Sequence, residues 1–435
     1  MSPIKILSNI ALSGAGTGNG ATSTVGEPSV GWSGQQVFVT GNWYASQSTG
    51  GGAAWTFVDP NTFLPAAGKG FCCDQTVMYA PSQTMMVWLL QYSEQGGTNV
   101  LRVAVNVGPA LGGNVWHWWD FQPDQVDATW TNQWFDFNHA ALSDNFLYIA
   151  SNVYRAPQSS QSPWVRAVVL RLPLAQLRAG GNLSYDYFDT TTDGSPRCTQ
   201  GATSVMYFAS NDSSQSQIRL FSWPENSTAV GTQDIPVSPW NTGPYLSQTP
   251  SGVNWLSRCD DRMTGGWVGR GRIGFMWSAN ALTAAGTTGP NARPNPYVRV
   301  VRLDEVTKQV VDEPDIWSSS VAYSYPDAAT NDQGDAGISL FRGGGASHPG
   351  HVVGALNAAA APAKWVLRGT ANGSHSDARW GDYVTCRRHD PDARGWVAAG
   401  YTLHGAALTD VRPRVVRFEM VPPPGGAAPT PHAIA

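Results

Sequence analysis

Charged side chains are scarce in this chain of 435 residues, in which Asp, Glu, Lys and Arg together make up 13% of the sequence. Lysine is nearly absent and occurs only at positions 5, 69, 308 and 364. The formal net charge is −4. So small an acidic excess argues against non-specific attraction to nucleic acid or to an anionic membrane, and we expect neither as a partner.

Long hydrophobic runs are also missing. No stretch of 18 or more apolar residues occurs, so no helix is expected to span a membrane. Residues 1–5 lack a basic segment followed by an apolar one, so no signal peptide is visible. Two interpretations stay open: the protein is intracellular, or it is secreted and a signal has been removed. The oligomeric state is not predicted.

Cysteine is rare, with five residues at positions 72, 73, 198, 259 and 386. The odd number leaves at least one cysteine unpaired within the chain, and five are too few for a disulfide scaffold. No Cys or Cys/His spacing resembles a zinc site. The adjacent Cys72 and Cys73 could form a vicinal disulfide, but we take two reduced, buried thiols as the expectation.

The abundant residues favour a protein made of short strands and tight turns. The chain holds 47 Gly and 30 Pro, and aromatic residues make up 11% of it. Helical periodicity is almost absent, and the one candidate helix covers residues 173–177. This composition is typical of an all-β protein.

A weak internal repeat runs through the chain. Each copy begins with one or two polar residues, here called anchors, and continues with alternating apolar strands. Successive anchors are separated by 47 to 66 residues, enough for one four-stranded propeller blade. The anchors are Glu27-Pro28, Cys73-Asp74-Gln75, Asn138-His139, Thr199-Gln200, Asp260-Asp261, Tyr325-Pro326-Asp327 and Gly381-Asp382.

Counting strands predicts how the ring closes. The last unit offers three strands, at 383–388, 396–403 and 414–420, and residues 4–12 supply a fourth. An N-terminal strand in the last blade would remove the exposed edges of an open ring. We therefore predict an all-β, seven-bladed β-propeller over residues 1–421. Residues 422–435 are predicted to form a flexible tail rich in Pro, Gly and Ala. The alternative, a pair of β-sandwich domains, does not explain one anchor recurring at blade-sized intervals.

Two segments resemble the sialidase-like, or BNR-repeat, propellers. Residues 48–56 are similar to the Asp-box turn, S-x-D-x-G-x-x-W, with Gly50 where the family has Asp. Residues 379–383, followed by Asp390-Pro391 and Gly395-Trp396, are similar to a segment common in bacterial proteins of this type. The resemblance implies the propeller fold, and Asp-boxes serve that fold from outer turns. It leaves the activity open, because such propellers include hydrolases, lyases, lectins and scaffolds.

The resemblance also implies an arginine cluster of the kind that holds a substrate carboxylate in sialidases. Arg197, Arg258 and Arg379 occupy equivalent positions before three anchors, and guanidinium groups pair bidentately with carboxylates. The family's arginine in the first blade has no counterpart, since no Arg precedes Arg102. The family's nucleophilic Tyr–Glu pair cannot be assigned, although Tyr383 adjoins Asp382. The alternative is that each arginine braces a carboxylate of the next blade.

Propeller geometry brings the anchors together, because the first strand of each blade lines the central channel. We expect a funnel with Asp74, His139, Asp261, Asp382 and Tyr383 as catalytic candidates. Two carboxylates flanking a glycosidic bond can act as acid and base, and His139 could move a proton. Alternatively, such polar residues bind neighbouring blades and channel water. The candidates for substrate binding are Glu27, Arg197, Gln200, Arg258, Arg262, Arg379, Trp118 and Trp119, and Asp327 completes the ring.

Tryptophan is concentrated between the second and third anchors, at positions 116, 118, 119, 130 and 134. Indole rings stack on the apolar faces of sugars, although many in a propeller wedge blades together. We expect Trp118 and Trp119 to meet a carbohydrate ligand. No cofactor or catalytic metal is predicted, a structural divalent cation at the funnel is left open, and His348 and His351 have only a weak metal-binding spacing.

Two functions remain after this reasoning. The favoured one is a carbohydrate-active enzyme, a glycoside hydrolase or a polysaccharide lyase, that uses the funnel carboxylates. The alternative is a non-catalytic propeller that binds a glycan or a protein through the same face. The first predicts that Asp74→Asn, Asp261→Asn or Asp382→Asn abolishes turnover; the second predicts that binding survives these changes and weakens in Trp118→Ala or Trp119→Ala.

Overall fold

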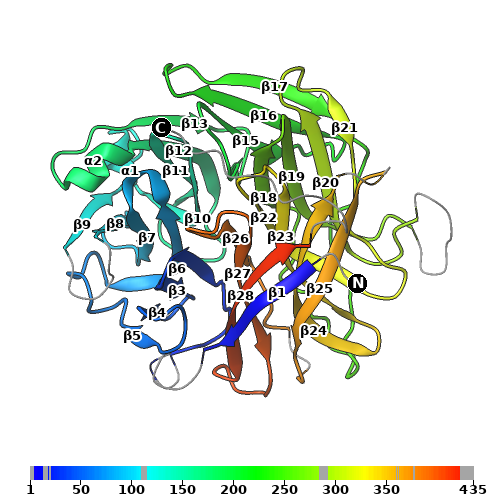
Figure 1. Cartoon of the computed structure of the whole chain (residues 1–435). Coiled ribbons are helices and arrows are strands. Elements are labelled where there is room, and N and C mark those ends of the chain that lie inside the picture. The colour runs from blue at the N-terminus through cyan, green and yellow to red at the C-terminus, as the bar shows by residue number, and fades with distance from the viewer. Residues whose placement is uncertain are drawn as a thin grey trace.

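The strands form seven four-stranded antiparallel sheets around a central axis (Figure 1). The computed structural model describes residues 4–12, 18, 21–108, 115–283, 292–358, 360, 362–375 and 378–421. The inner strands of successive sheets contact one another in turn, and the seventh contacts the first. The chain is therefore a closed seven-bladed β-propeller, as predicted. The predicted tail, residues 422–435, lies outside the described residues.

The first three blades are meanders that run outward from the axis. Blade 1 comprises β2 (Ser29–Ser33), β3 (Gln36–Thr40), β4 (Ala45–Ser48) and β5 (Thr56–Val58). Blade 2 comprises β6 (Phe71–Ala80), β7 (Met85–Tyr92), β8 (Leu101–Val107) and β9 (Trp116–Phe121). Blade 3 comprises β10 (Gln133–Leu142), β11 (Phe146–Arg155), β12 (Trp164–Pro173) and β13 (Asp186–Thr190). The short helices η2 (Pro81–Gln83), α1 (Pro123–Val126) and α2 (Leu174–Ala179) lie in connections, and α2 overlaps the one predicted helix.

The next three blades repeat this order. Blade 4 comprises β14 (Arg197–Cys198), β15 (Val205–Asn211), β16 (Gln217–Pro224) and β17 (Gly231–Pro236). Blade 5 comprises β18 (Met263–Gly269), β19 (Arg272–Ala279), β20 (Tyr297–Asp304) and β21 (Val310–Asp312). Blade 6 comprises β22 (Ala322–Thr330), β23 (Ala336–Gly344), β24 (Ser347–Asn357) and β25 (Lys364–Asn372).

Blade 7 joins the two ends of the described chain. Its strands, from the axis outward, are β26 (Thr385–Arg388), β27 (Trp396–Leu403), β28 (Val411–Met420) and β1 (Ile4–Ala11). Strand β1 is antiparallel to β28, with Ile4 opposite Met420 and Ala11 opposite Arg414, and the two strands lie side by side in Figure 1. The predicted N-terminal closing strand is confirmed.

The closing strand is held by its apolar face. Ile4 is 1% exposed and packs in a cluster with Val353, Trp396 and Val416. We expect Ile4→Ala to lower the free energy of unfolding by about 2–5 kcal/mol, because the buried side chain leaves a cavity. Urea denaturation measures this loss. Lys5→Ala on the same strand, where the ammonium group is exposed and pairs with Glu419 at 3.3 Å, should change stability by less than about 1 kcal/mol.

Large aromatic side chains fill the spaces between blades. Trp88 of blade 2 meets Phe38 of blade 1 at 5.1 Å between ring centroids. Trp396 of blade 7 donates from Nε1 to the carbonyl of Ala329 in blade 6 at 2.9 Å, and it lies so close to Gly337 that a Cβ there would come within 2.5 Å of its ring. These tryptophans wedge neighbouring sheets together.

The turn that resembles an Asp-box lies on the outer hairpin of blade 1, between β4 and β5. The hydroxyl of Ser48 accepts hydrogen bonds from the backbone N–H groups of Gly50 and Gly52, at 3.3 and 2.9 Å. Gly52 has φ +90°, which favours glycine. The segment therefore stabilises a turn far from the axis, as the resemblance implies.

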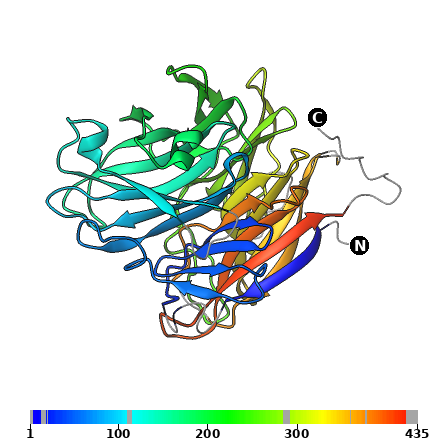
Figure 2. The ribbon, with the colours of Figure 1, turned by 60° about the vertical axis from the view of Figure 1, so that its left-hand side comes forward.

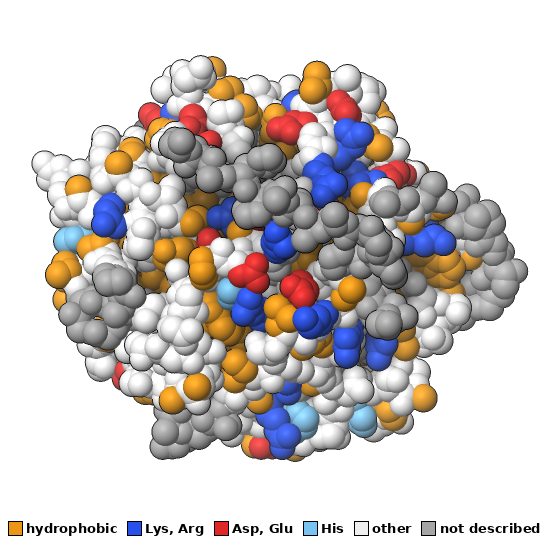
Figure 3. Space-filling model, in the orientation of Figure 1, with side chains coloured by type: hydrophobic (Ala, Val, Ile, Leu, Met, Phe, Trp, Pro, Cys, Tyr) orange, Lys and Arg blue, Asp and Glu red, His pale blue; other side chains and the backbone are white. Residues whose placement is uncertain are grey.

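The blades fan around the axis when seen from the side (Figure 2). Acidic and basic side chains gather near the centre of the face in Figure 3. Each inner strand begins at one mouth of the central channel and ends at the other, which gives the channel two distinct ends. In the described part of the chain, no helix is long and apolar enough to cross a membrane.

Candidate functional site

The leading ends of the inner strands surround a cavity at one mouth of the channel, here called the funnel cavity. Its volume is about 300 Å³, which suits a small ligand or one end of a larger one. Blades 1, 2, 3, 5 and 7 contribute to it. Its charged lining residues are Glu27, Asp74, Asp136, Arg258, Arg262 and Asp382.

Local irregularities of the backbone deliver these side chains. The pairing of β6 with β7 shifts register between Phe71 and Gln75, and that of β10 with β11 shifts between Asp136 and His139. Such bulges change the direction in which side chains point, compared with the regular alternation along a strand. Glu27 and Phe137 also have positive φ, 42° and 56°. Backbone strain of this kind costs free energy and tends to cluster at functional positions.

Glu27 and Asp74 form a carboxyl pair at the base of the funnel cavity. Both carboxyls and the Asn42 side chain line the same cavity, and the two carboxyls lie close enough to influence each other's ionisation. Burial, with the nearby charge of Asp382, raises the pKa of Glu27 to about 7. Burial and the charges of Glu27 and Asp136 raise the pKa of Asp74 well above its ordinary value. Two such carboxyls titrate together, and the pair keeps a proton near neutral pH.

Asp382 faces this pair and is flanked by two guanidinium groups. Arg258 Nε lies 3.6 Å from Oδ1, and Arg262 Nη2 lies 3.3 Å from Oδ2. The backbone N–H of Asp382 donates to Glu27 Oε1 at 3.0 Å. Oδ1 accepts no hydrogen bond from the described residues. Oδ1 is itself buried, whereas the Asp382 side chain as a whole is 19% exposed and lines the funnel cavity.

Asp136 and Asp260 complete the charge pattern, and neither was among the predicted candidates. Asp136 Oδ1 accepts from Gln91 Nε2 at 3.0 Å, and burial raises its pKa. Asp260 accepts a hydrogen bond from Arg262 Nε at 2.7 Å. The guanidinium of Arg262 is therefore shared between Asp260 and Asp382. Arg262 also stacks over the Phe137 ring, 4.0 Å from its centroid. The acids of the funnel cavity therefore outnumber its arginines.

His139 and Tyr383 lie beneath the funnel cavity, not on its surface. Their rings are 5.4 Å apart, and Phe137, which lines the cavity, contacts both. Burial and three arginines lower the pKa of His139 well below its ordinary value, which keeps the ring neutral. Burial and the charge of Asp74 raise the pKa of Tyr383. A phenol in this environment does not ionise readily, so it makes a poor nucleophile.

Arg197 and Asp327 were expected at the funnel but lie deeper in the channel. Asp327 is fully buried and accepts from Arg197 Nη2 at 2.5 Å and from Arg387 Nη1 at 2.8 Å. The backbone N–H of Cys386 also donates to it, at 2.9 Å. Arg197 therefore braces a carboxylate of blade 6, which is the structural alternative to substrate binding.

Three other candidates do not reach the funnel cavity, and for these the expected placement is wrong. Asp261 turns away and accepts from Trp240 Nε1 at 3.1 Å, because Asp260 takes the inward position. Gln200 lines a cavity at the opposite mouth and donates to the carbonyl of Ala140 at 2.8 Å. Arg379 donates to the carbonyl of Ala406 at 3.2 Å. Of the predicted arginine cluster, only Arg258 lies at the funnel cavity.

The expected tryptophan platform is also misplaced. Trp118 and Trp119 belong to β9, the outermost strand of blade 2, and Trp119 Nε1 donates to the carbonyl of Gly181 at 3.0 Å. Trp43 lines the funnel cavity instead, with 38% of its surface exposed. It lies in the short connection between β3 and β4, where no cluster of aromatic residues drew attention to it.

Cys72 and Cys73 are joined by a disulfide next to Asp74, so the expectation of two reduced, buried thiols is wrong. Cys73 lines the funnel cavity. Among the described residues, no group of three or more His, Cys, Asp or Glu is arranged to hold a metal ion. The ring of His351 is buried between the hydroxyls of Ser339 and Thr370, each 2.8 Å away.

The sequence matches no protein-family model and no curated protein. Its shape is similar to that of an α-L-arabinofuranosidase from Fusarium graminearum solved with an iminosugar inhibitor (TM-score 0.44, 8% identity, 95% of this chain and 98% of that one). It is also similar to an α-L-arabinanase from Penicillium chrysogenum complexed with arabinobiose (0.44, 11%, 96% and 99%). A third is the sialidase of Trypanosoma rangeli with the inhibitor DANA (0.41, 9%, 83% and 56%). Likenesses this distant carry no argument about activity, and the fold assignment rests on strand pairing.

Proposed function

We propose that the protein is a carbohydrate-active enzyme, a glycoside hydrolase, that works at the funnel cavity. The observation that carries the proposal is the protonated Glu27–Asp74 pair facing the arginine-flanked carboxylate of Asp382. Hydrolysis of a glycosidic bond needs a proton for the leaving oxygen and a carboxylate for the water or the sugar carbon. The funnel cavity supplies both groups from different blades.

The proton donor in this proposal is the Glu27–Asp74 pair. A carboxylic acid donates efficiently when its pKa lies near the working pH. The two carboxyls are neighbours in the funnel cavity and interact with each other, so they are too close to flank a glycosidic bond on opposite sides. They therefore act as one acid, in which either carboxyl can pass the shared proton to the substrate.

Asp382 takes the opposite role. Its side chain lines the funnel cavity, and Arg258 and Arg262 lie 3.6 and 3.3 Å from its two oxygens. A carboxylate held in this way can activate water or attack the anomeric carbon directly. His139 and Tyr383 then act as positioning residues, because they support Phe137 and the acid pair from below.

A sugar suits the remaining lining. Trp43 offers an exposed indole face for the apolar side of a pyranose or furanose ring. Asn42 and Asp136 provide polar groups for hydroxyls.

The charge balance favours a neutral sugar and a hydrolase over a lyase. The elimination that a lyase performs needs cations to stabilise the uronate carboxylate of its substrate. Here Arg262 is already shared between Asp260 and Asp382, and Arg258 faces Asp382. An anionic sugar would meet an excess of carboxylates, whose repulsion opposes its binding.

The pH dependence of hydrolysis tests the acid pair. The protonated form of Glu27 is the donor, so the rate should fall as pH rises through its pKa of about 7. Hydrolysis of 4-nitrophenyl glycosides of neutral sugars between pH 4 and 9 measures this limb. In Glu27→Gln the limb should shift or vanish, and an unchanged profile would remove Glu27 from the mechanism.

Binding without catalysis is the second candidate, and the exposed Trp43 favours it. An indole above a polar cavity binds a glycan whether or not bonds are broken. A glycan array separates the two cases: a non-catalytic propeller retains intact oligosaccharides, loses them in Trp43→Ala, and releases no reducing ends.

A further inference from the structure

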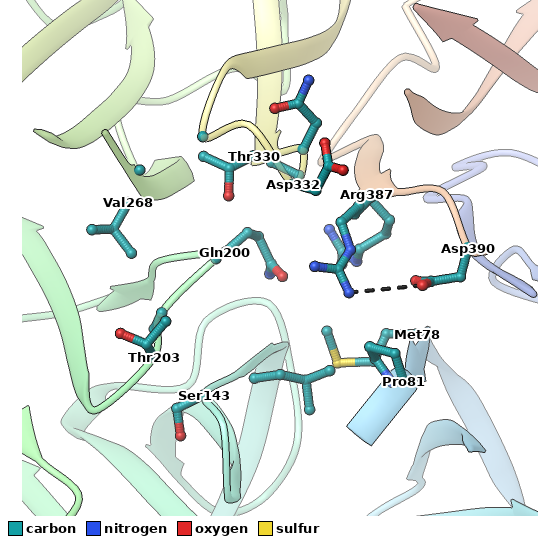
Figure 4. Close-up of a pocket in the computed structure, with 18 of the residues that line it drawn as sticks. Met78, Pro81, Ser143, Gln200, Thr203, Val268, Thr330, Asp332, Arg387 and Asp390 are labelled. Atoms are coloured by element: carbon teal, nitrogen blue, oxygen red, sulfur yellow. Dashed lines mark ion pairs between the residues drawn. The ribbon is translucent and has the colours of Figure 1, made fainter. Parts of the chain in front are cut away.

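The opposite mouth of the channel holds a second and larger cavity, here called the far cavity. Its volume is about 510 Å³, within the range of small-molecule sites. Met78, Gln200, Thr330 and Arg387 come from four different blades and surround one space (Figure 4). The funnel cavity shares none of these residues.

Arg387 gives the far cavity an unsatisfied donor. Its residue surface is 6% exposed, and its Nη1 donates to Asp327 and to the carbonyl of Cys386. Its Nε has no hydrogen-bond partner among the described residues. A buried guanidinium N–H without a partner is costly, and the Arg387 side chain lines the far cavity, where an anion can pair with its guanidinium.

The charges behind Arg387 leave a positive excess. Arg197, which is 2% exposed, shares the single carboxylate of Asp327 with Arg387. Nη1 of Arg197 likewise lacks a partner among the described residues. Burial and the charges of nearby arginines, including these two, lower the pKa of His139, so its ring is neutral and adds no further charge. Two buried cations therefore face one buried anion.

The other charged residues of the far cavity restrict what can enter. Arg388 pairs with Asp390 at 3.7 Å, and Arg270 pairs with Asp335 at 3.1 Å; Figure 4 marks the ion pair at Asp390 with a dashed line. Asp144 and Asp332 also line it. A polyanion would meet these carboxylates, whereas a single negative group could reach Arg387.

Apolar side chains form one part of the remaining lining, beside polar ones such as Ser143 and Asn331. Met78, Leu142 and Val268 line the same space. These side chains would cover a short hydrocarbon tail and remove it from water.

We propose that the far cavity binds a small organic monoanion, a carboxylate with a short apolar tail, whose head group pairs with Arg387. The site is separate from the proposed hydrolytic one, so either proposal can fail without the other. Acetate, hexanoate and inorganic phosphate are the probes, titrated at constant ionic strength and followed by calorimetry and by the melting temperature.

Hexanoate should bind saturably and raise the melting temperature. It should bind at least about tenfold more tightly than acetate, because its additional methylene groups are buried against the apolar wall. Arg387→Gln should abolish the binding. Thr203→Trp, which places a large ring at an exposed position lining the far cavity, should abolish it without touching the buried charges.

Two controls locate the effect. Arg219→Gln removes a guanidinium that pairs with Asp234 on an outer strand, and Asp382→Asn alters the funnel cavity; both should leave hexanoate binding unchanged. If Arg387→Gln fails to fold, hexanoate binding by Thr203→Trp tests the proposal instead. The proposal is overturned if wild type shows no saturable binding, if phosphate binds as tightly as hexanoate, or if binding survives in Thr203→Trp.

Discussion

Replacing Asp382 with asparagine should reduce glycoside hydrolysis by roughly 10²–10⁴-fold, the range typical of a lost acid or base group. Asparagine keeps the shape of the side chain but cannot activate water or attack a sugar carbon. The loss should appear in kcat more than in KM, because the substrate contacts of Trp43 and Asn42 remain. Release of 4-nitrophenol from aryl glycosides gives both constants.

Asp261→Asn is the matched control, since Asp261 lies on the same connection as Asp260 but faces Trp240. Its turnover should stay within about twofold of wild type. Equal losses in the two variants would show that a general defect, not the funnel chemistry, is responsible. An Asp382→Asn variant with full activity and an unchanged melting temperature would contradict the proposed role.

Asp327→Asn should strongly destabilise the protein. The variant leaves Arg197 and Arg387 buried without their carboxylate, and breaking a buried ion pair by removing one partner costs about 3–5 kcal/mol. Chemical denaturation followed by tryptophan fluorescence measures the loss, because the many buried indoles report unfolding.

The comparison for this prediction is Asp234→Asn. Asp234 also accepts an ion pair from an arginine, Arg219, at 2.7 Å, but its side chain is 45% exposed. Exposed pairs contribute little, so this change should cost less than about 1 kcal/mol. If Asp327→Asn and Asp234→Asn lower the free energy of unfolding by the same small amount, the charges around Asp327 are not shielded from water as described.

The ring could be predicted from sequence because a blade is a local pattern. Alternating apolar residues and recurrent anchors mark each inner strand. Only three strands could be counted after residue 383, so the fourth strand of the last blade was expected from the N-terminus. Strand β1 fills that place. Each of these inferences depends on spacing along the chain, which the sequence shows directly.

The site was only partly predictable because its side chains depart from that pattern. Asp136 reaches the funnel cavity through a bulge, whereas alternation pointed to His139. Asp260 and Asp261 are neighbours, and only the turn in which Asp260 Oδ1 accepts the N–H of Arg262 decides which one faces inward. Arg197 matched Arg258 in position, but a carboxylate far along the chain, Asp327, holds it deep in the channel. Such long-range partners leave no local signal.

Closure of blade 7 by β1 has a consequence for the order in which the protein matures. Residues 4–11 are synthesised before residues 411–420, so the last sheet cannot be completed until the second segment has been made. Asp382 reaches the funnel cavity from that same blade, while Glu27 and Asp74 come from blades 1 and 2, which are synthesised earlier than blade 7. The Glu27–Asp74 pair and the carboxylate of Asp382 therefore meet only once the ring has closed.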